Sequence, residues 1–89
     1  MSNPDDPTVD LGESAQKSAQ TVGPVPGYYR HFKGNVYEVL TCGVDANTLT
    51  PVVIYRDVEK GWTWTRPITD WNSPVVVNGT PTQRFKPVP

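Results

Sequence analysis

The chain has 89 residues, a net charge of −1, ten prolines and a single cysteine. This length allows one domain with a thin core, which favours a surface groove over an enclosed active site. One cysteine excludes a disulfide scaffold. The sequence has neither an apolar run of about 20 residues nor a signal-peptide pattern at its start, so we expect a cytoplasmic protein with no membrane contact.

Charge is distributed unevenly along the chain. Residues 1–26 carry four carboxylates against one lysine, whereas residues 27–89 carry seven cations against five carboxylates. A duplex-DNA binder usually shows a much stronger basic stripe, so duplex DNA is an unlikely partner. The mild excess still allows a local cationic site in residues 27–89.

Residues 1–26 are predicted to form a flexible, acidic, proline-rich leader. They contain four prolines and no aromatic side chain, so they cannot bury enough apolar surface to offset the entropy of ordering. The alternative is one or two helical turns within residues 13–20, where Ala15 and Ala19 are spaced i, i+4.

Residues 27–40 read as a β-hairpin around which the rest of the chain is organised. Gly34 and Asn35 tolerate the backbone conformations of a tight turn, and the flanking runs are rich in β-forming residues. The period of a strand places Tyr29 and His31 on one face and Tyr28 and Arg30 on the other.

Further short β segments follow, with no long helix between them. Turn residues separate segments at 36–43, 52–58 and 62–66, and Asn78-Gly79 marks a closing hairpin over residues 75–85. Residues 68–71 are predicted to form a single helical turn after Pro67. Short strands must hide their edges, so we predict an all-β domain over residues 27–89, a small SH3-like barrel of five or six short antiparallel strands.

The same region resembles the domain-of-unknown-function 1653 family. The motifs that carry the likeness are Gly27-x-Tyr29-Arg30-His31-Phe32-Lys33-Gly34-Asn35-x-Tyr37-x-Val39-Leu40, Val53-Ile54-Tyr55, Trp64-x-Arg66-Pro67, and Gly79 followed by Arg84-Phe85. The resemblance spans roughly residues 26–86. It implies an SH3-like β-barrel of bacterial and phage proteins, and it implies no catalytic residues.

The sequence offers little material for catalysis. His31 is the only histidine, and Cys42 precedes Gly43 at a strand end, away from any helix N-terminus that would lower its pKa. One histidine and one cysteine cannot supply the clustered ligands that zinc requires, and no glycine-rich phosphate loop is present. We therefore expect no enzyme, no metal and no cofactor.

Recognition is the function that the residues favour. Large rings exceed what so thin a core needs, and arginines lie near them, a combination suited to stacking a base and binding a phosphate. The leading hypothesis is a non-catalytic module for a small anionic, base-containing ligand, such as a nucleotide or cyclic-nucleotide signal that a phage-encoded protein would sequester. The predicted ligand-binding residues are Tyr29, Arg30, His31, Lys33, Tyr55, Trp62, Trp64, Arg66, Trp71 and Arg84.

Several alternatives stay open at this level. Trp64 and Tyr37 are expected in the core, whereas Trp62 and Trp71 are expected to be exposed. Arg66 could instead bond turn carbonyls, and His31 could pack within the hairpin. An exposed aromatic groove would equally suit a proline-rich or extended peptide, and a homo-oligomer that buries the rings is a third hypothesis.

Overall fold

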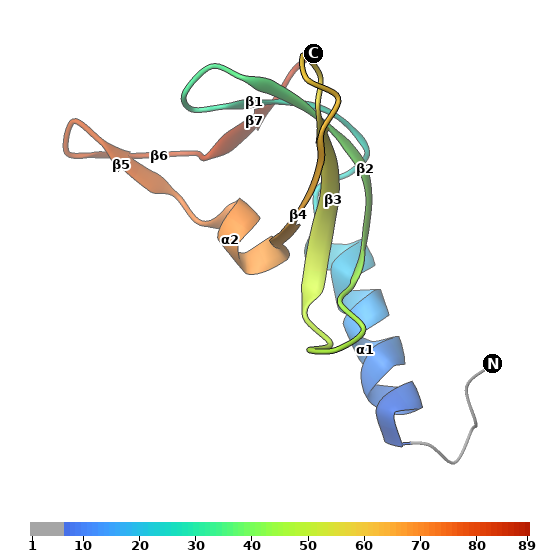
Figure 1. The fold of residues 1–89 in the computed structure, drawn as a ribbon. Coiled ribbons are helices and arrows are strands. Elements are labelled where there is room, and N and C mark those ends of the chain that lie inside the picture. The colour runs from blue at the N-terminus through green and yellow to red at the C-terminus, as the bar shows by residue number, and fades with distance from the viewer. Residues whose placement is uncertain (1–6) are drawn as a thin grey trace.

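Seven strands and two helices follow one another in the computed structural model, which describes residues 7–89, with side chains from residue 11 onward (Figure 1). The elements in chain order are α1 (Pro7–Val22), β1 (Gly27–His31), β2 (Val36–Val44), β3 (Pro51–Asp57), β4 (Thr63–Pro67), α2 (Ile68–Asn72), β5 (Val75–Val77), β6 (Thr80–Thr82) and β7 (Phe85–Pro87).

Five strands form one antiparallel sheet in the order β4-β3-β2-β1-β7, and β5 pairs with β6 in a separate hairpin. The prediction of a mostly β protein with short antiparallel strands is confirmed. The closed barrel is not formed, because β4 and β7 are the outer strands and no pairing joins them within residues 7–89. In the chain between β4 and β7, α2 is followed by the β5–β6 hairpin, which projects away from the five-stranded sheet (Figure 1).

The turns follow the residue types that predicted them. Gly34 takes a φ of +108° between β1 and β2, where a side chain would be strained. Asn78 and Gly79 have φ of +51° and +78°, the conformation of a two-residue hairpin turn, and they join Val77 to its partner Thr80. The two hairpins expected at these positions are confirmed.

The core gathers on one face of the curved sheet. Val39 and Val53 are fully buried at its centre, and α2 covers them with Ile68 and Trp71. The Trp71 indole stacks flat on Phe85, with ring centroids 3.7 Å apart and planes 2° apart. This stack closes the core between α2 and β7.

The predicted disorder of the leader is wrong for the part that the structure describes. Ala19 of α1 is buried at 1% exposure, Gln20 donates to the Cys42 carbonyl at 3.2 Å, and Asn72 donates to the Val22 carbonyl at 3.1 Å. Small side chains allow this docking, because a Cβ at Gly23 would lie 2.6 Å from the Cys42 sulfur. Residues 1–6 of the predicted leader lie outside the described residues.

Neither α1 nor α2, the helices of residues 7–89, is long and apolar enough to span a membrane.

Candidate functional site

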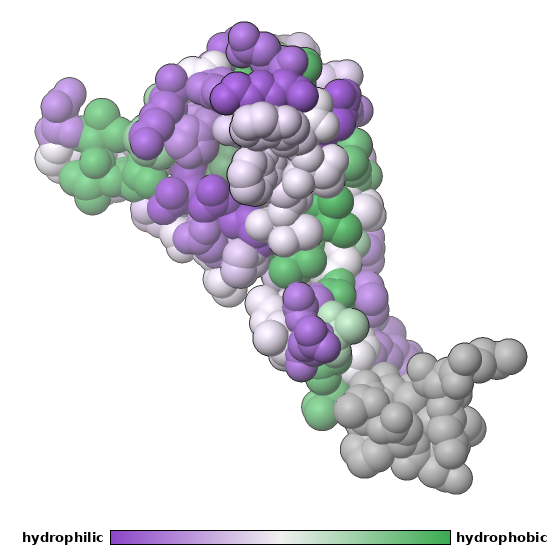
Figure 2. Space-filling view, in the orientation of Figure 1, coloured by the Kyte–Doolittle hydropathy of each residue, from purple (hydrophilic) through white to green (hydrophobic). Residues whose placement is uncertain are grey.

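A cleft of about 320 Å³ lies beside the edge strand β4 and the β3–β4 turn. We call it the tryptophan cleft. The residues that line it are Asn35, Tyr37, Tyr55, Asp57, Lys60, Trp62, Trp64 and Arg66. In Figure 2 a pale area of intermediate hydropathy lies over the sheet beside hydrophilic residues, whereas the β5–β6 hairpin is largely hydrophobic.

The β3–β4 turn fixes the first of the two tryptophans. The buried Asp57 carboxylate accepts hydrogen bonds from the backbone N–H groups of Glu59 and Lys60, each at 2.9 Å. Gly61 then takes a φ of +76°, and the Trp62 carbonyl accepts the Asp57 N–H at 2.8 Å. Hydrogen bonds to Asp57 therefore stabilise the turn, and they fix the backbone position of Trp62 at its end.

Strand pairing fixes the second tryptophan. Trp64 lies directly opposite Tyr55 of β3, so the two rings share the core-facing side of the sheet. No strand of residues 7–89 pairs with the far edge of β4, and Trp64 is 49% exposed while Trp62 is 56% exposed. Their ring centroids lie 6.3 Å apart at an interplanar angle of 68°, which leaves two differently oriented faces open to solvent.

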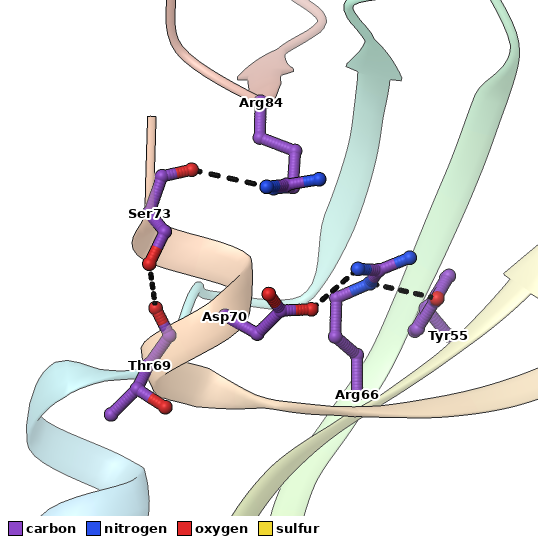
Figure 3. A network of polar contacts seen from close by, with 6 residues as sticks. All are labelled: Tyr55, Arg66, Thr69, Asp70, Ser73 and Arg84. Atoms are coloured by element: carbon purple, nitrogen blue, oxygen red, sulfur yellow. Dashed lines mark hydrogen bonds and ion pairs between the residues drawn. The ribbon is translucent and has the colours of Figure 1, made fainter. Parts of the chain in front are cut away.

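Arg66 lines the cleft, and Figure 3 shows its polar contacts. Its Nε donates to the Tyr55 hydroxyl at 3.2 Å and its NH1 donates to Asp70, while the guanidinium lies 5.6 Å from the Phe85 ring centroid. Burial lowers the pKa of this group, but the hydrogen bonds to Tyr55 and Asp70 outweigh that effect and raise it. The alternative that Arg66 bonds turn carbonyls is wrong, since its partners are side chains.

The other predicted cations lie away from this cleft. Arg84 donates to the Ser73 carbonyl at 3.3 Å beside α2 (Figure 3), and Arg30 donates to the Gly34 carbonyl at 3.0 Å. His31 packs against Phe85 at a centroid distance of 5.0 Å, and its Nδ1 accepts the Lys33 N–H at 3.2 Å. The expectation that His31 packs within the hairpin is confirmed.

The structure brings Tyr55, Trp62, Trp64 and Arg66 together out of the predicted ligand-binding residues. Tyr29, Tyr55 and Trp71 are buried at 7%, 5% and 4% exposure, so none of the three can stack a ligand as predicted, although the Tyr55 hydroxyl still lines the cleft through its contact with Arg66. Exposure of Trp62 is confirmed. Exposure of Trp71 is wrong, because α2 turns this ring onto the sheet, and a core position for Trp64 is wrong, because β4 lies at the edge.

Sequence reasoning did not place Asn35, Asp57 and Lys60 in the site, nor Tyr37, which was expected in the core. Asn35 reaches it from the β1–β2 turn, and Lys60 lies with its Nζ 4.7 Å from the Trp62 ring centroid. The signal available in the sequence was Asp57 at the end of β3, since an aspartate there commonly caps the following turn.

The described residues hold no cluster of three or more histidine, cysteine, aspartate or glutamate side chains that could bind a metal. Cys42 is buried beside α1, and burial raises the pKa of its thiol. The tryptophan cleft combines stacking surface, one lysine, one partly engaged arginine and hydrogen-bonding groups. That combination is suited to recognition.

The sequence of residues 27–87 matches the family described as Protein of unknown function (DUF1653). The chain belongs to the DUF1653 family. A crystal structure of a DUF1653 protein from Bordetella bronchiseptica is similar to this chain at 32% sequence identity and a TM-score of 0.67, covering 73% of this chain and 87% of that one. Among curated proteins, no match to the chain is found.

Family membership supports the fold of this DUF1653 domain, and the family description names no activity. The matched region begins at Gly27, the first residue of β1, and runs through Pro87, the last residue of β7. It therefore contains every residue of the tryptophan cleft.

Proposed function

We propose that this DUF1653 protein is a non-catalytic module that binds a small, anionic, base-containing ligand in the tryptophan cleft. The observation that carries the proposal is the pair Trp62 and Trp64, each about half exposed and set at 68° to one another beside a 320 Å³ cleft. Exposed indoles leave apolar area in contact with water, which a flat ligand would cover.

Stacking supplies the larger part of the expected affinity. A base against an aromatic side chain contributes about 1–3 kcal/mol, so contact with both indoles is consistent with micromolar binding once a charged contact is added.

Lys60 and Arg66 provide the charged contact. Lys60 makes no ion pair with a described carboxylate, and its position over Trp62 places a cation at the rim of the stacking surface. Arg66 is paired with Asp70 but keeps its NH2 group unbonded to the described residues. A phosphate at the rim would meet both cations, while Asn35 offers an amide to the edge of a base.

An extended peptide is the second candidate, because β4 presents an open edge that carries the exposed Trp64, and the exposed Trp62 directly precedes this strand. Edge strands accept a further strand through main-chain hydrogen bonds, and proline-rich segments dock on aromatic grooves. A peptide would depend on the β4 backbone, whereas a nucleotide would not.

Fluorescence titration tests the proposal. Adenosine 5′-monophosphate should quench the tryptophan emission in a saturable way, and Trp62→Ala and Trp64→Ala should each lower the affinity about tenfold or more, as expected for loss of one stacking contact. Val76→Ala, at an exposed valine on β5 outside the cleft, is the matched control and should bind normally. Saturable binding of a proline-rich peptide with no response to any mononucleotide would overturn the nucleotide proposal in favour of the peptide.

We further propose that the domain is an SH3-like barrel left open between β4 and β7. A four-strand meander from β1 to β4, a short helix, and a last strand that returns beside β1 support this description. Sequestration of a signalling nucleotide by a phage-encoded copy stays a prediction.

A further inference from the structure

A second cleft, of about 440 Å³, lies on the other side of the β1–β2 turn. Phe32, Val77 and Pro87 give it apolar walls, and Arg30, His31 and Lys86 are its ionisable side chains. We call it the basic cleft. Its volume lies within the usual range for a small-molecule site of about 300–1,000 Å³, so it is large enough to hold a ligand group of its own.

Two like charges of the basic cleft repel one another in the protein without ligand. Arg30 of β1 lies directly opposite Lys86 of β7 in the strand register. Like charges at opposed positions destabilise a sheet, and no described carboxylate forms an ion pair with either residue. A bound anion would offset this repulsion. The cleft is therefore suited to an anionic ligand, which apolar walls alone would not favour.

The two clefts share a wall. Gly34 lines the basic cleft and its neighbour Asn35 lines the tryptophan cleft. The ring centroids of His31, in the basic cleft, and Tyr37, in the tryptophan cleft, are 6.4 Å apart. One ligand of modest length can therefore reach from one cleft to the other across this turn.

Two cations, Arg30 and Lys33, lie at the β1–β2 turn. The Arg30 guanidinium is held over the turn by its bond to the Gly34 carbonyl at 3.0 Å, and its other N–H groups make no hydrogen bond to the described residues. The Lys33 ammonium lies 5.7 Å from the Phe32 ring centroid. A pre-positioned guanidinium and a lysine form a suitable contact for a phosphate group.

We propose that the ligand is a dinucleotide, with one base against Trp62 and Trp64, the second base in the basic cleft beside Phe32, and the linking phosphate over the β1–β2 turn at Arg30 and Lys33. This inference rests on the proposed function, because it assigns the first base to the tryptophan cleft. It adds a second site and names the class of ligand that fills both.

Calorimetry with two probes tests the inference. 5′-Phosphoadenylyl-(3′→5′)-adenosine, which keeps the 5′-phosphate of the mononucleotide, should bind one to one and at least tenfold more tightly than adenosine 5′-monophosphate, because the second base and the linking phosphate add contacts that the mononucleotide cannot make. Arg30→Gln should bring the dinucleotide affinity close to that of the mononucleotide while leaving quenching by the mononucleotide unchanged. Lys17→Gln, which removes an exposed cation on α1, is the control and should alter neither affinity.

Each failure has its own signature. Equal affinities for the two probes, or a dinucleotide affinity insensitive to Arg30→Gln, would overturn the dinucleotide assignment and leave the tryptophan cleft as a mononucleotide site. Absence of quenching by adenosine 5′-monophosphate at any concentration would overturn the proposed function itself. Equal binding of an acidic peptide such as tetraglutamate, again dependent on Arg30, would show a general anion site and would also overturn the assignment.

Discussion

Arg66 shows how a single residue links the core to the candidate site. Its guanidinium lies near the core ring Phe85 and bonds Tyr55 and Asp70, and the residue also lines the tryptophan cleft. Bidentate or stacked arginines are poorly replaced by lysine, since the planar group serves several partners at once. Arg66 thus fixes the shape of the cleft as well as its charge.

His31 gives the protein a defined response to acid. Burial, followed by the nearby charges of Arg66, Lys33 and Arg84, lowers the pKa of its imidazole. The unfolded chain therefore takes up the proton at a higher pH than the folded protein does. Above the ordinary pKa of about 6.5 both states are neutral, and as the pH falls below it the free energy of unfolding decreases.

Urea unfolding at about pH 7.5 and pH 5 measures this effect. The wild type should lose more stability over that interval than His31→Gln, which keeps an acceptor for the Lys33 N–H but does not titrate. Equal losses for the two proteins would show that other groups, and not His31, produce the acid sensitivity.

The fate of the tryptophans shows what a sequence can and cannot predict about single residues. The i, i+2 spacing correctly placed Trp64 and Arg66 on one face of a strand, and Trp62, which directly precedes β4, lines the same cleft. Whether that face is covered depends on where β4 lies in the sheet and on how α2 packs. Those are tertiary facts, so Trp64 and Trp71 were each assigned to the wrong environment.

At the scale of elements, the docking of α1 depends on a close contact at its C-terminal end. Among the helix side chains from residue 11 onward Ala19 is the buried one, and Gly23 lies where a Cβ would approach the Ala19 carbonyl oxygen and the Cys42 sulfur, each at 2.6 Å. Such a contact tolerates no added methyl group without movement.

Gly23→Ala should therefore destabilise the protein by about 1–3 kcal/mol and speed the alkylation of Cys42, whose buried thiol is otherwise protected. Thermal unfolding and the rate of iodoacetamide labelling report the two effects. Gly12→Ala is the matched control, since a Cβ there meets nothing within 4 Å and should leave the labelling rate unchanged. Unaltered labelling in Gly23→Ala would contradict the docking of α1 on Cys42.

The strands were easier to predict than the helix. Alternating side chains and turn residues such as Gly34 and Asn78-Gly79 are local signals, and β1 to β4 follow them within a residue or two. The sequence of α1 lacks aromatic residues and resembles a flexible linker, because what orders it is contact with Cys42 and Ile68 far along the chain.

At the scale of the whole molecule, charge is concentrated around one turn. Arg30, Lys33 and Lys86 make no ion pair with a described carboxylate, and they flank the β1–β2 turn that separates the two clefts. The net charge of −1 conceals this, since carboxylates elsewhere balance the total. A local field of this kind attracts a small anion without making the protein a general nucleic-acid binder.

The hypothesis of a homo-oligomer stays a prediction, and exposed apolar residues outside the two clefts offer a surface for it. Val76 on the β5–β6 hairpin is 73% exposed and Leu11 on α1 is 58% exposed, and both lie outside the two clefts. A homo-oligomer formed there would leave the proposed ligand site open.

The central claim is that Trp62 and Trp64 contact a base-containing ligand while Trp71 does not. The three indole N–H resonances in a ¹⁵N-correlated NMR spectrum, assigned by replacing each tryptophan in turn with phenylalanine, test this claim directly during a titration with adenosine 5′-monophosphate. We predict that the Trp62 and Trp64 resonances shift with one saturation curve while that of the buried Trp71 stays in place. Resonances that all remain still, or a shift confined to Trp71, would contradict the account.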